Sequence, residues 1–500
     1  MRPRVATPRD RALAECAAGA RAIAAGKTDA GLKRYAAALV LAPHDADVAA
    51  VHGVALRSAG RLKNAQRELI RAISLDAQRA DSYVQLAQTY ATVSDYKQAA
   101  DAFHAAAILK RTDAQAWAHT AHAMRCAGRV AEGLTVGRHA AALDDRDPSI
   151  ANTLAVLLHR SGAVDEAMAL CERVRAFAPD DCHLSLTHAM LLRTCGQHAA
   201  GWALHERRLE LPELMQRPHP PQSRRWDGSP LEQRHILVRG EQGLGDQVQF
   251  ARWAASLRDV GASRITVQCA TPLIRLLQTL QGIDAVVTMS ADAPAHDVHV
   301  DVMSLPHLLR TGSDLRGGMV PYLTAARLND ALDARLVAAP RAGRLRLAVV
   351  WGGTPKHTDD RVRSLPLTTL LPVLEREDVQ TVVLQQGSPR DQLDAVPAAV
   401  RERWLDIAND CIDFADTAQV VSACDAVLSV DTSVAHVAGA LGVPTWVMVA
   451  HPAEWRWGRE GSDSPYYPHT TVLRQRACGD WSAVMQGAQD AIDTWHRSAR

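Results

Sequence analysis

One short stretch of the chain has the residue types and spacing of an anion-binding site. Asp431, Thr432 and Ser433 follow an apolar run typical of a strand and precede a small-residue segment typical of a helix. A strand that opens into a helix in this way offers free backbone N–H groups, two hydroxyls and the positive end of the helix dipole, and phosphate is the usual guest. His436 would lie about one turn inside that apolar helix. The alternative is a plain helix cap followed by a core histidine.

A glycine-rich turn carries a candidate general base. Gly243 and Gly245 stand between the strand-like run His235–Arg239 and a helical stretch, and Asp246 follows them. Glycine lets a ligand approach the backbone closely. Asp246 could accept a proton at a cleft, or it could simply complement the dipole of its helix. The spacing matches neither G-x-G-x-x-G nor a Walker loop, so nucleoside triphosphate chemistry is not predicted.

A third loop adds cationic groups. The β-rich run Leu345–Trp351 ends in a glycine pair that leads to Thr354 and Lys356, with Arg363 close behind. Open α/β sheets bind ligands beyond the carboxyl ends of their strands, where this loop would lie. Cations beside a helix N-terminus are suited to neutralising a diphosphate.

These loops require parallel strands to position them. Short apolar runs alternate with helix-like segments beyond residue 235, which is the pattern of a parallel sheet. The further strand candidates are Arg264–Cys269, Ala285–Thr288, His296–Val302, Thr381–Gln385, Ala426–Val430 and Thr445–Val449.

The first 215 residues repeat every 34 residues. Apolar residues, small residues and turn residues each keep this register over five periods. The pattern is typical of the tetratricopeptide repeat, in which helix pairs stack and leave a concave face suited to a polypeptide partner. The alternative is that the repeats only space or dimerise the rest. The residues in register are Leu41, Leu75, Leu109, Leu143 and Phe177; Gly53, Ala87, Ala121, Ala155 and Ala189; and Gly60, Ser94, Gly128, Gly162 and Gly196.

Composition shifts divide the chain. We expect a repeat domain over 1–215 with five full repeats and a partial sixth, and a proline-rich junction over 216–234. A first α/β lobe over 235–340 and a second over 341–500 follow. The boundary between helix pairs and alternating strands is the sharpest of these divisions.

The totals exclude several classes of protein. The 500 residues carry a net charge of +1 and no long basic run, which disfavours nucleic-acid binding. The nine cysteines show no pairing at zinc spacing and indicate thiols in a reducing compartment. No window approaches a membrane span and no apolar leader follows the basic N-terminus, so we expect a cytoplasmic protein.

The motifs together resemble a known family. The strings GLGDQVQF, WGGTPKHTDDRVRSLPL, DAVLSVDTSVAHVAGALGVPTWVM and EWRWGREGSDSPYYP resemble bacterial tetratricopeptide-repeat glycosyltransferases. Their C-terminal half is similar to the ADP-heptose:lipopolysaccharide heptosyltransferases of glycosyltransferase family nine. The resemblance implies an all-α repeat solenoid followed by a GT-B fold, in which two Rossmann-like lobes face each other across a cleft.

The resemblance also implies roles for residues. Asp246 looks like the family's catalytic base, Thr354 and Lys356 like donor-phosphate contacts, and Asp431, Thr432 and His436 like the D-T-x-x-x-H donor signature. Ser433 stands where the family usually has glycine, and this leaves the sugar open. The implied activity is inverting transfer from a nucleotide-diphospho-sugar without a metal or other cofactor. The alternatives are a sugar-nucleotide epimerase or hydrolase, and a non-catalytic scaffold that senses sugar nucleotides.

Overall fold

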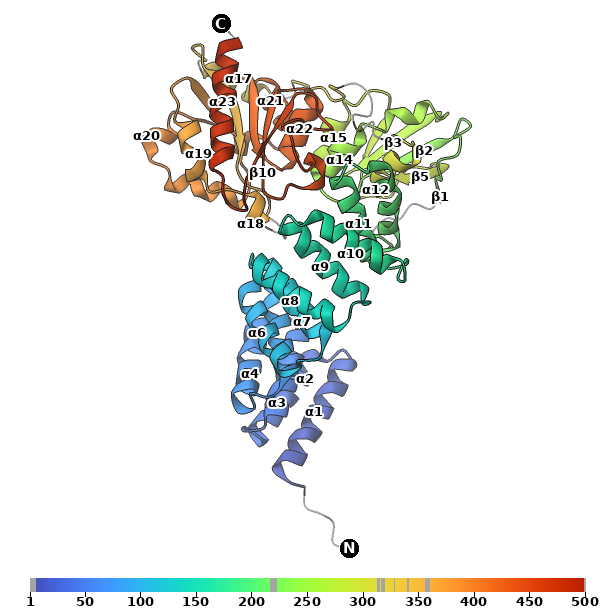
Figure 1. The fold of residues 1–500 in the computed structure, drawn as a ribbon, viewed down its shortest axis with the longest axis vertical. Coiled ribbons are helices and arrows are strands. Elements are labelled where there is room, and N and C mark those ends of the chain that lie inside the picture. Colours follow the sequence, from blue (N-terminus) through green and yellow to red (C-terminus); the bar gives the residue numbers. More distant parts are fainter. Residues whose placement is uncertain are drawn as a thin grey trace. The chain divides into compact units, whose positions relative to one another are not determined.

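The computed structural model forms two compact units, Met1–Pro179 and Asp180–Arg500 (Figure 1). It describes residues 6–215, 223–312, 315, 320–327, 329–339, 341–355 and 360–498. The first unit is helical, and the second combines helices with two parallel sheets.

The first unit is a series of helix pairs with the predicted 34-residue period. Within each pair a turn of three to four residues separates the two helices, and from the second pair onward each helix begins 34 residues after its counterpart in the preceding pair. The prediction of a tetratricopeptide-like array is therefore confirmed for the helices of this unit. The helices are α1 Pro8–Ala24, α2 Thr28–Leu41, α3 Ala46–Ser58, α4 Leu62–Leu75, α5 Ala80–Thr92, α6 Tyr96–Leu109, α7 Ala114–Cys126, α8 Val130–Leu143, α9 Pro148–Arg160 and α10 Val164–Arg175.

Backbone conformation explains the periodic turn residues. Gly60, Gly128 and Gly162 follow the first helix of their pairs with φ between 73° and 86°, a region that glycine enters without strain. Ser94 occupies the same slot with φ 61°, so the turn is kept where the glycine is missing. The periodic small residues are buried because helices cross there. At Gly53 a Cβ would lie 2.7 Å from Leu69 Cγ.

The second unit begins with the last helix pair of the series. α11 (Cys182–Thr194) and α12 (His198–His205) continue the 34-residue spacing, but they belong to the compact unit that contains the sheets. Trp202 on α12 is 1 % exposed and packs in the same core as Phe250 and Trp455. The compact boundary therefore falls at Pro179, not near 215 as we expected, because this helix pair buries its apolar face against the α/β part.

A buried ion pair joins the end of this segment to the first sheet. Arg208, in the short helix η1 (Glu206–Glu210), donates to both carboxylate oxygens of Glu241 at 2.6 and 2.9 Å. Glu241 Oε1 also accepts the backbone N–H of Met303 at 3.0 Å. Both charged side chains are almost fully buried, so each depends on the other for its solvation.

Two all-parallel sheets form the rest of the second unit. The first has the order β1-β5-β2-β3-β4 and the second the order β11-β10-β9-β6-β7-β8. The strands of the first sheet are β1 Arg224–Arg225, β2 His235–Arg239, β3 Arg264–Cys269, β4 Ala285–Thr288 and β5 Val298–Asp301. Those of the second sheet are β6 Leu345–Val350, β7 Val379–Val383, β8 Leu405–Asp406, β9 Ala426–Val430, β10 Thr445–Val449 and β11 Thr470–Arg474.

Helices connect these strands and cover the sheets. The helices are α13 Pro212–Met215, α14 Leu244–Ala251, α15 Ile274–Leu277, α16 Leu305–Leu308, α17 Asp330–Ala338, α18 Asp360–Arg363, α19 Leu367–Leu374, α20 Ala398–Arg401, α21 Phe414–Ser422, α22 Ser433–Leu441 and α23 Ser482–Ser498.

Two of the expected lobe boundaries differ from the packing. The junction over 216–234 includes β1, which pairs with β5, and Trp226, which is 2 % exposed in the core. The end of the junction is thus part of the first sheet. Leu332 and Leu336 of α17 pack with β6 and β7 residues in the core of the second sheet, so that layer begins before residue 340. The length of these segments hid both features, since a two-residue strand has no periodicity to detect.

One apolar core reaches from the first sheet to the second. Val248 and Phe250 of α14 share a core cluster with Val437 of α22 and with Tyr467. The contact places α14, which follows β2, against α22, which follows β9. The loops at the carboxyl ends of these two strands are therefore neighbours.

Candidate functional site

Asp246 is anchored on both sides of its carboxylate. It is the third residue of α14, and its Oδ2 accepts the backbone N–H of Gly243 at 2.9 Å. Its Oδ1 is paired with the Arg456 guanidinium, which comes from the segment after β10. The sequence-based alternatives for Asp246 are thus not exclusive, because the carboxylate serves the helix end and also faces a residue beyond the second sheet.

Arg456 links several polar groups at this point. It donates from Nη1 to Glu454 Oε1 at 2.6 Å and from Nε to Gln249 Oε1 at 2.9 Å. Burial alone lowers the pKa of Arg456, but Glu454, Asp246 and Asp431 together raise it above its ordinary value. The guanidinium is therefore a fixed positive charge. Burial raises the pKa of Glu454, and Arg456 opposes that effect.

The helix that follows β9 begins as the sequence predicts. Thr432 is the N-cap of α22, but its hydroxyl makes no hydrogen bond to the N–H groups of the helix. It lies instead 3.1 Å from the Ser429 hydroxyl. Asp431, Thr432 and Ser433 are all half-buried. The first N–H groups of this nine-residue helix thus lack a side-chain cap, and they coincide with the positive end of its dipole.

Arg363 joins the loop after β6 to the start of α22. Its Nη1 donates to the Asp431 carbonyl at 3.1 Å, and its Nε donates to Asp360 at 3.2 Å. Its guanidinium lies so close to Gly353 that a Cβ there would be 2.3 Å from Nη2. This glycine is needed for the close approach. A cation is therefore held beside the N-terminus of α22, as the predicted role of Arg363 requires.

The other predicted residues of this loop are less well placed to judge. Thr354 is exposed and Lys356 lies outside the described residues. The preceding residues are held firmly, since Gln385 Oε1 accepts the N–H groups of Trp351 and Gly352, each at 2.8 Å.

His436 is packed between the two helices. It is 4 % exposed, its Nδ1 lies 3.0 Å from the Tyr467 hydroxyl, and its ring stacks on Trp457 with centroids 5.6 Å apart. Burial, with help from Arg456 and Arg252, holds its pKa well below the ordinary value, so the ring is neutral. This environment favours the core-histidine interpretation over direct contact with a ligand.

Gly245 allows the two helix ends to meet. A Cβ at Gly245 would lie 2.8 Å from His436 Cδ2 and 3.4 Å from the Cα of Ser433. Residue 245 is therefore glycine because α14 and α22 approach each other here. Asp246, Ser433 and His436 are brought together by this contact, whereas sequence reasoning gave no role to Arg456 or Glu454. The only signal for them was the EWRWG string, whose spacing carries no recognisable chemistry.

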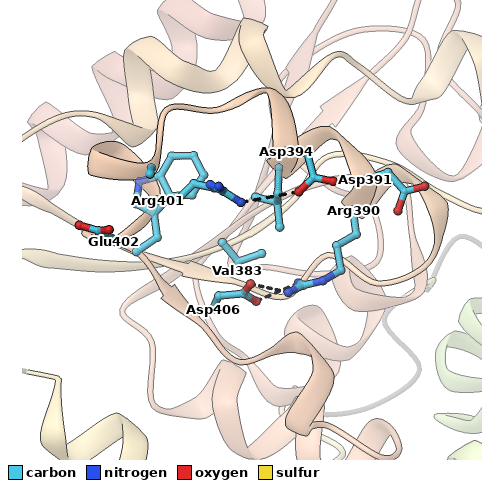
Figure 2. Close-up of a pocket in the computed structure, with 10 residues that line it drawn as sticks. Val383, Arg390, Asp391, Asp394, Arg401, Glu402 and Asp406 are labelled. Carbon is cyan, nitrogen blue, oxygen red and sulfur yellow. Dashed lines mark hydrogen bonds and ion pairs between the residues drawn. The ribbon is translucent and has the colours of Figure 1, made fainter.

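A separate hollow lies beside β7 and β8. Its volume is about 460 Å³, and its lining includes Val383, Trp404 and several charged side chains (Figure 2). Arg390 is paired with Asp406, and Arg401 lies 3.7 Å from Asp394. None of the residues predicted as site residues lines it.

Two wider searches of the described residues found nothing. No cluster of three or more His, Cys, Asp or Glu side chains there could hold a metal ion. None of the helices there has both the length and the apolarity needed to cross a membrane.

The comparisons with known proteins give distant similarities. No family model matches the chain. Protein FlbA of Caulobacter vibrioides is 22% identical over 354 residues, which cover 66% of this chain and 59% of that protein. The chain thus spans 59% of the length of this curated relative.

Solved structures with helical repeats are similar to part of the chain. YrrB, described as a TPR protein with an unusual peptide-binding site, is 17% identical and covers 36% of this chain and 92% of its own, with a TM-score of 0.31. PilF of Pseudomonas aeruginosa is 16% identical over 41% of this chain and 94% of its own, with a TM-score of 0.34. The tetratricopeptide-like architecture of the first unit rests on its own helix pairs and their spacing.

Proposed function

We propose that the protein is an inverting, metal-independent glycosyltransferase that moves a sugar from a nucleotide-diphospho-sugar to an acceptor. The observation that carries the proposal is the meeting of α14 and α22, where Gly245 approaches His436 and Ser433. A candidate base and a candidate phosphate site thereby lie side by side, each beyond the carboxyl end of a parallel strand. Ligands of open α/β sheets bind at such ends. In this proposal the two sheets are the two lobes of a GT-B fold.

Each group would have a defined role in the transfer. The acceptor hydroxyl attacks the anomeric carbon, the bond from that carbon to the diphosphate breaks, and the nucleoside diphosphate leaves. Asp246 takes the proton of the hydroxyl, and the configuration at the anomeric carbon is inverted. The N–H groups at the start of α22 and the Arg363 guanidinium stabilise the charge on the leaving group. Lys356 is proposed to add a second cation.

The repeat array would hold the acceptor. We propose that its concave face binds a polypeptide, or a glycan carried by one, and that this raises the acceptor concentration at Asp246. A cytoplasmic location is part of the proposal, and nine free cysteines, most of them buried, are compatible with a reducing compartment.

A specific observation favours a second candidate, a scaffold that senses sugar nucleotides without turnover. Both oxygens of the Asp246 carboxylate are engaged, one by Gly243 and one by Arg456. A carboxylate held in this way can be purely structural. The scaffold would bind nucleotide at α22 but would not release nucleoside diphosphate from a donor.

The two candidates differ in one measurable product. The purified full-length chain is incubated with a panel of nucleotide sugars, with and without cell extract as the acceptor source, and nucleoside diphosphate release is followed. Release that Asp246→Asn abolishes supports the transferase. Asp45→Asn is the matched control, because Asp45 caps α3 through backbone N–H groups in the repeat array. Tight nucleotide binding without release from any donor supports the scaffold, and release without sugar transfer indicates a hydrolase.

A further inference from the structure

A buried arginine of the last helix pair lies against two tryptophan rings. The Cζ of Arg193 on α11 is 4.6 Å from the ring centre of Trp202 and 4.0 Å from that of Trp455. Arg193 is 4 % exposed, and its Nε donates to the Ala189 carbonyl at 3.1 Å. Within the described part of the chain its Nη1 has no hydrogen-bond partner. The aromatic faces thus supply much of the stabilisation of its charge.

Arg193 remains charged at neutral pH. Burial lowers its pKa to about 9, which is still well above 7. The rings of Trp202 and Trp455 are nearly perpendicular, with centroids 5.5 Å apart, so the cation occupies the angle between them. Removal of this side chain would leave space beside the Trp455 ring.

The Trp455 ring also contacts the cation that faces Asp246. The Cζ of Arg456 lies 4.1 Å from the centre of this ring, and Arg456 is paired with Asp246. A chain of direct contacts therefore runs from α11 to α14 through Arg193, Trp455, Arg456 and Asp246. The ring and the flanking Glu454 together define where the Arg456 guanidinium lies.

We infer that Arg193 and Trp455 are positioning residues, through which the last helix pair of the repeat series sets the place of the Asp246 carboxylate. The inference rests on the proposed role of Asp246 as the base. Neither residue contacts the substrate, and both act through Arg456. The helix pair α11–α12 is then part of the transfer machinery, not of the acceptor-binding array.

The test is a cycle of full-length variants that separates positioning from general support of the fold. Arg193→Met should lower donor turnover about 10–100-fold per folded molecule, which is the range for misplacing a catalytic group by about 1 Å. In an Asp246→Asn background the same change should lower turnover less than about twofold, because the group it positions is already gone. Arg193→Lys, which keeps the charge, should lose less than Arg193→Met. Equal losses in both backgrounds would overturn the inference.

Arg146→Met is the matched control, since Arg146 lies over the Phe177 ring in the first unit at 5.7 Å. It should leave turnover unchanged in both backgrounds, and a loss equal to that of Arg193→Met would overturn the inference.

A second readout applies if no donor is turned over. The melting temperatures of Arg193→Met, Asp246→Asn and the double variant are then compared, using the transition that Arg456→Met shifts. A double variant no less stable than the worse single variant supports the contact chain even though the proposed function has failed. Additive losses would overturn it.

Discussion

The Asp246 carboxylate shows how one residue can serve both fold and chemistry. The substitution Asp246→Asn keeps an oxygen that can accept the Gly243 N–H, but it removes the charge that pairs with Arg456. We expect the fold and nucleotide binding to persist and donor turnover to fall by about 10²–10⁴-fold, because a neutral amide cannot accept the proton. Nucleoside diphosphate release and calorimetric nucleotide binding check this. Turnover near that of the wild type would leave Asp246 as a helix-end residue only.

His436 leads to a prediction about pH. Its pKa in the folded protein is well below the ordinary value of 6.5, so the unfolded chain takes up a proton that the folded protein does not. The stability it contributes is complete above about pH 6.5 and falls as the pH drops below that value.

We expect His436→Phe to flatten the acid side of the melting-temperature profile between pH 7 and 5. The removed slope is at most about 1.4 kcal/mol per pH unit. The phenylalanine ring can still stack on Trp457, so the variant should fold. Parallel profiles for the variant and the wild type would show that the ring is accessible to protons when folded.

At the scale of residues, the sequence predicts types better than contacts. Gly245 and Ser433 are 188 positions apart, and nothing local to either reveals that they touch. Arg456 was missed for the same reason, since its partner Asp246 lies 210 positions away. Glu241 was read only as a departure from a motif, yet it is a buried partner of Arg208. Long-range pairing of this kind leaves no spacing pattern in the chain.

The elements were predicted where the pattern was long or strongly apolar. β2, β3, β4, β9 and β10 have the predicted bounds, because buried parallel strands are continuous apolar runs. β8 and β1 were missed because two-residue edge strands have no such run. The periodic apolar residues at the ends of the second helices are partly exposed, Leu41 at 37 % and Phe177 at 48 %. Their register is a property of the repeat and not of the core.

The contact between α14 and α22 gives a prediction at this scale. Gly245→Ala places a methyl group 2.8 Å from the His436 ring, which Tyr467 and Trp457 hold in place. We expect a loss of about 1–3 kcal/mol in the free energy of unfolding, as for other overpacked sites, and weaker nucleotide binding. Urea unfolding and calorimetry are the measurements.

A matched glycine in another helix separates packing from helix propensity. Gly487→Ala in α23 meets only a methyl of Leu473, at 3.0 Å, so it should be neutral or stabilising. Adding His436→Ala to Gly245→Ala should recover part of the loss, because the clash is removed. A Gly245→Ala protein as stable as the wild type would mean that the two helix ends can separate freely.

At the scale of the whole molecule, the boundary between the units determines which fragments can fold. The sequence places the end of the helical region near residue 215, because the 34-residue spacing continues into α12. Packing places it at Pro179, because Trp202 and Arg208 are buried in the α/β part. A repeat pattern reports the origin of a segment, whereas burial reports what it stabilises.

Two N-terminal deletions therefore should behave differently. The fragment 180–500 keeps α11, α12 and η1, and we expect it to fold and to bind a nucleoside diphosphate, since the start of α22 and Arg363 are intact. The fragment 211–500 loses Arg208 and leaves the fully buried Glu241 without its cation, which typically costs about 3–5 kcal/mol. It also loses the buried Trp202 ring, with a cost of about 3–5 kcal/mol. Together these losses are comparable to the whole stability of a typical domain, about 5–15 kcal/mol. We expect the shorter fragment to aggregate or to melt without a cooperative transition in circular dichroism.

The substitution Glu241→Gln in the fragment 211–500 tests the cause. It removes the unpaired charge but not the exposed apolar surface, so it should restore solubility in part and not the full melting transition. If 211–500 folds and binds nucleotide as well as 180–500 does, the last helix pair belongs with the acceptor-binding array. In that case transfer by 211–500 should also be intact for small acceptors. If instead 180–500 binds nucleotide but fails to modify the natural acceptor, the helix pairs before Pro179 hold that acceptor, because they are the only part that this fragment lacks.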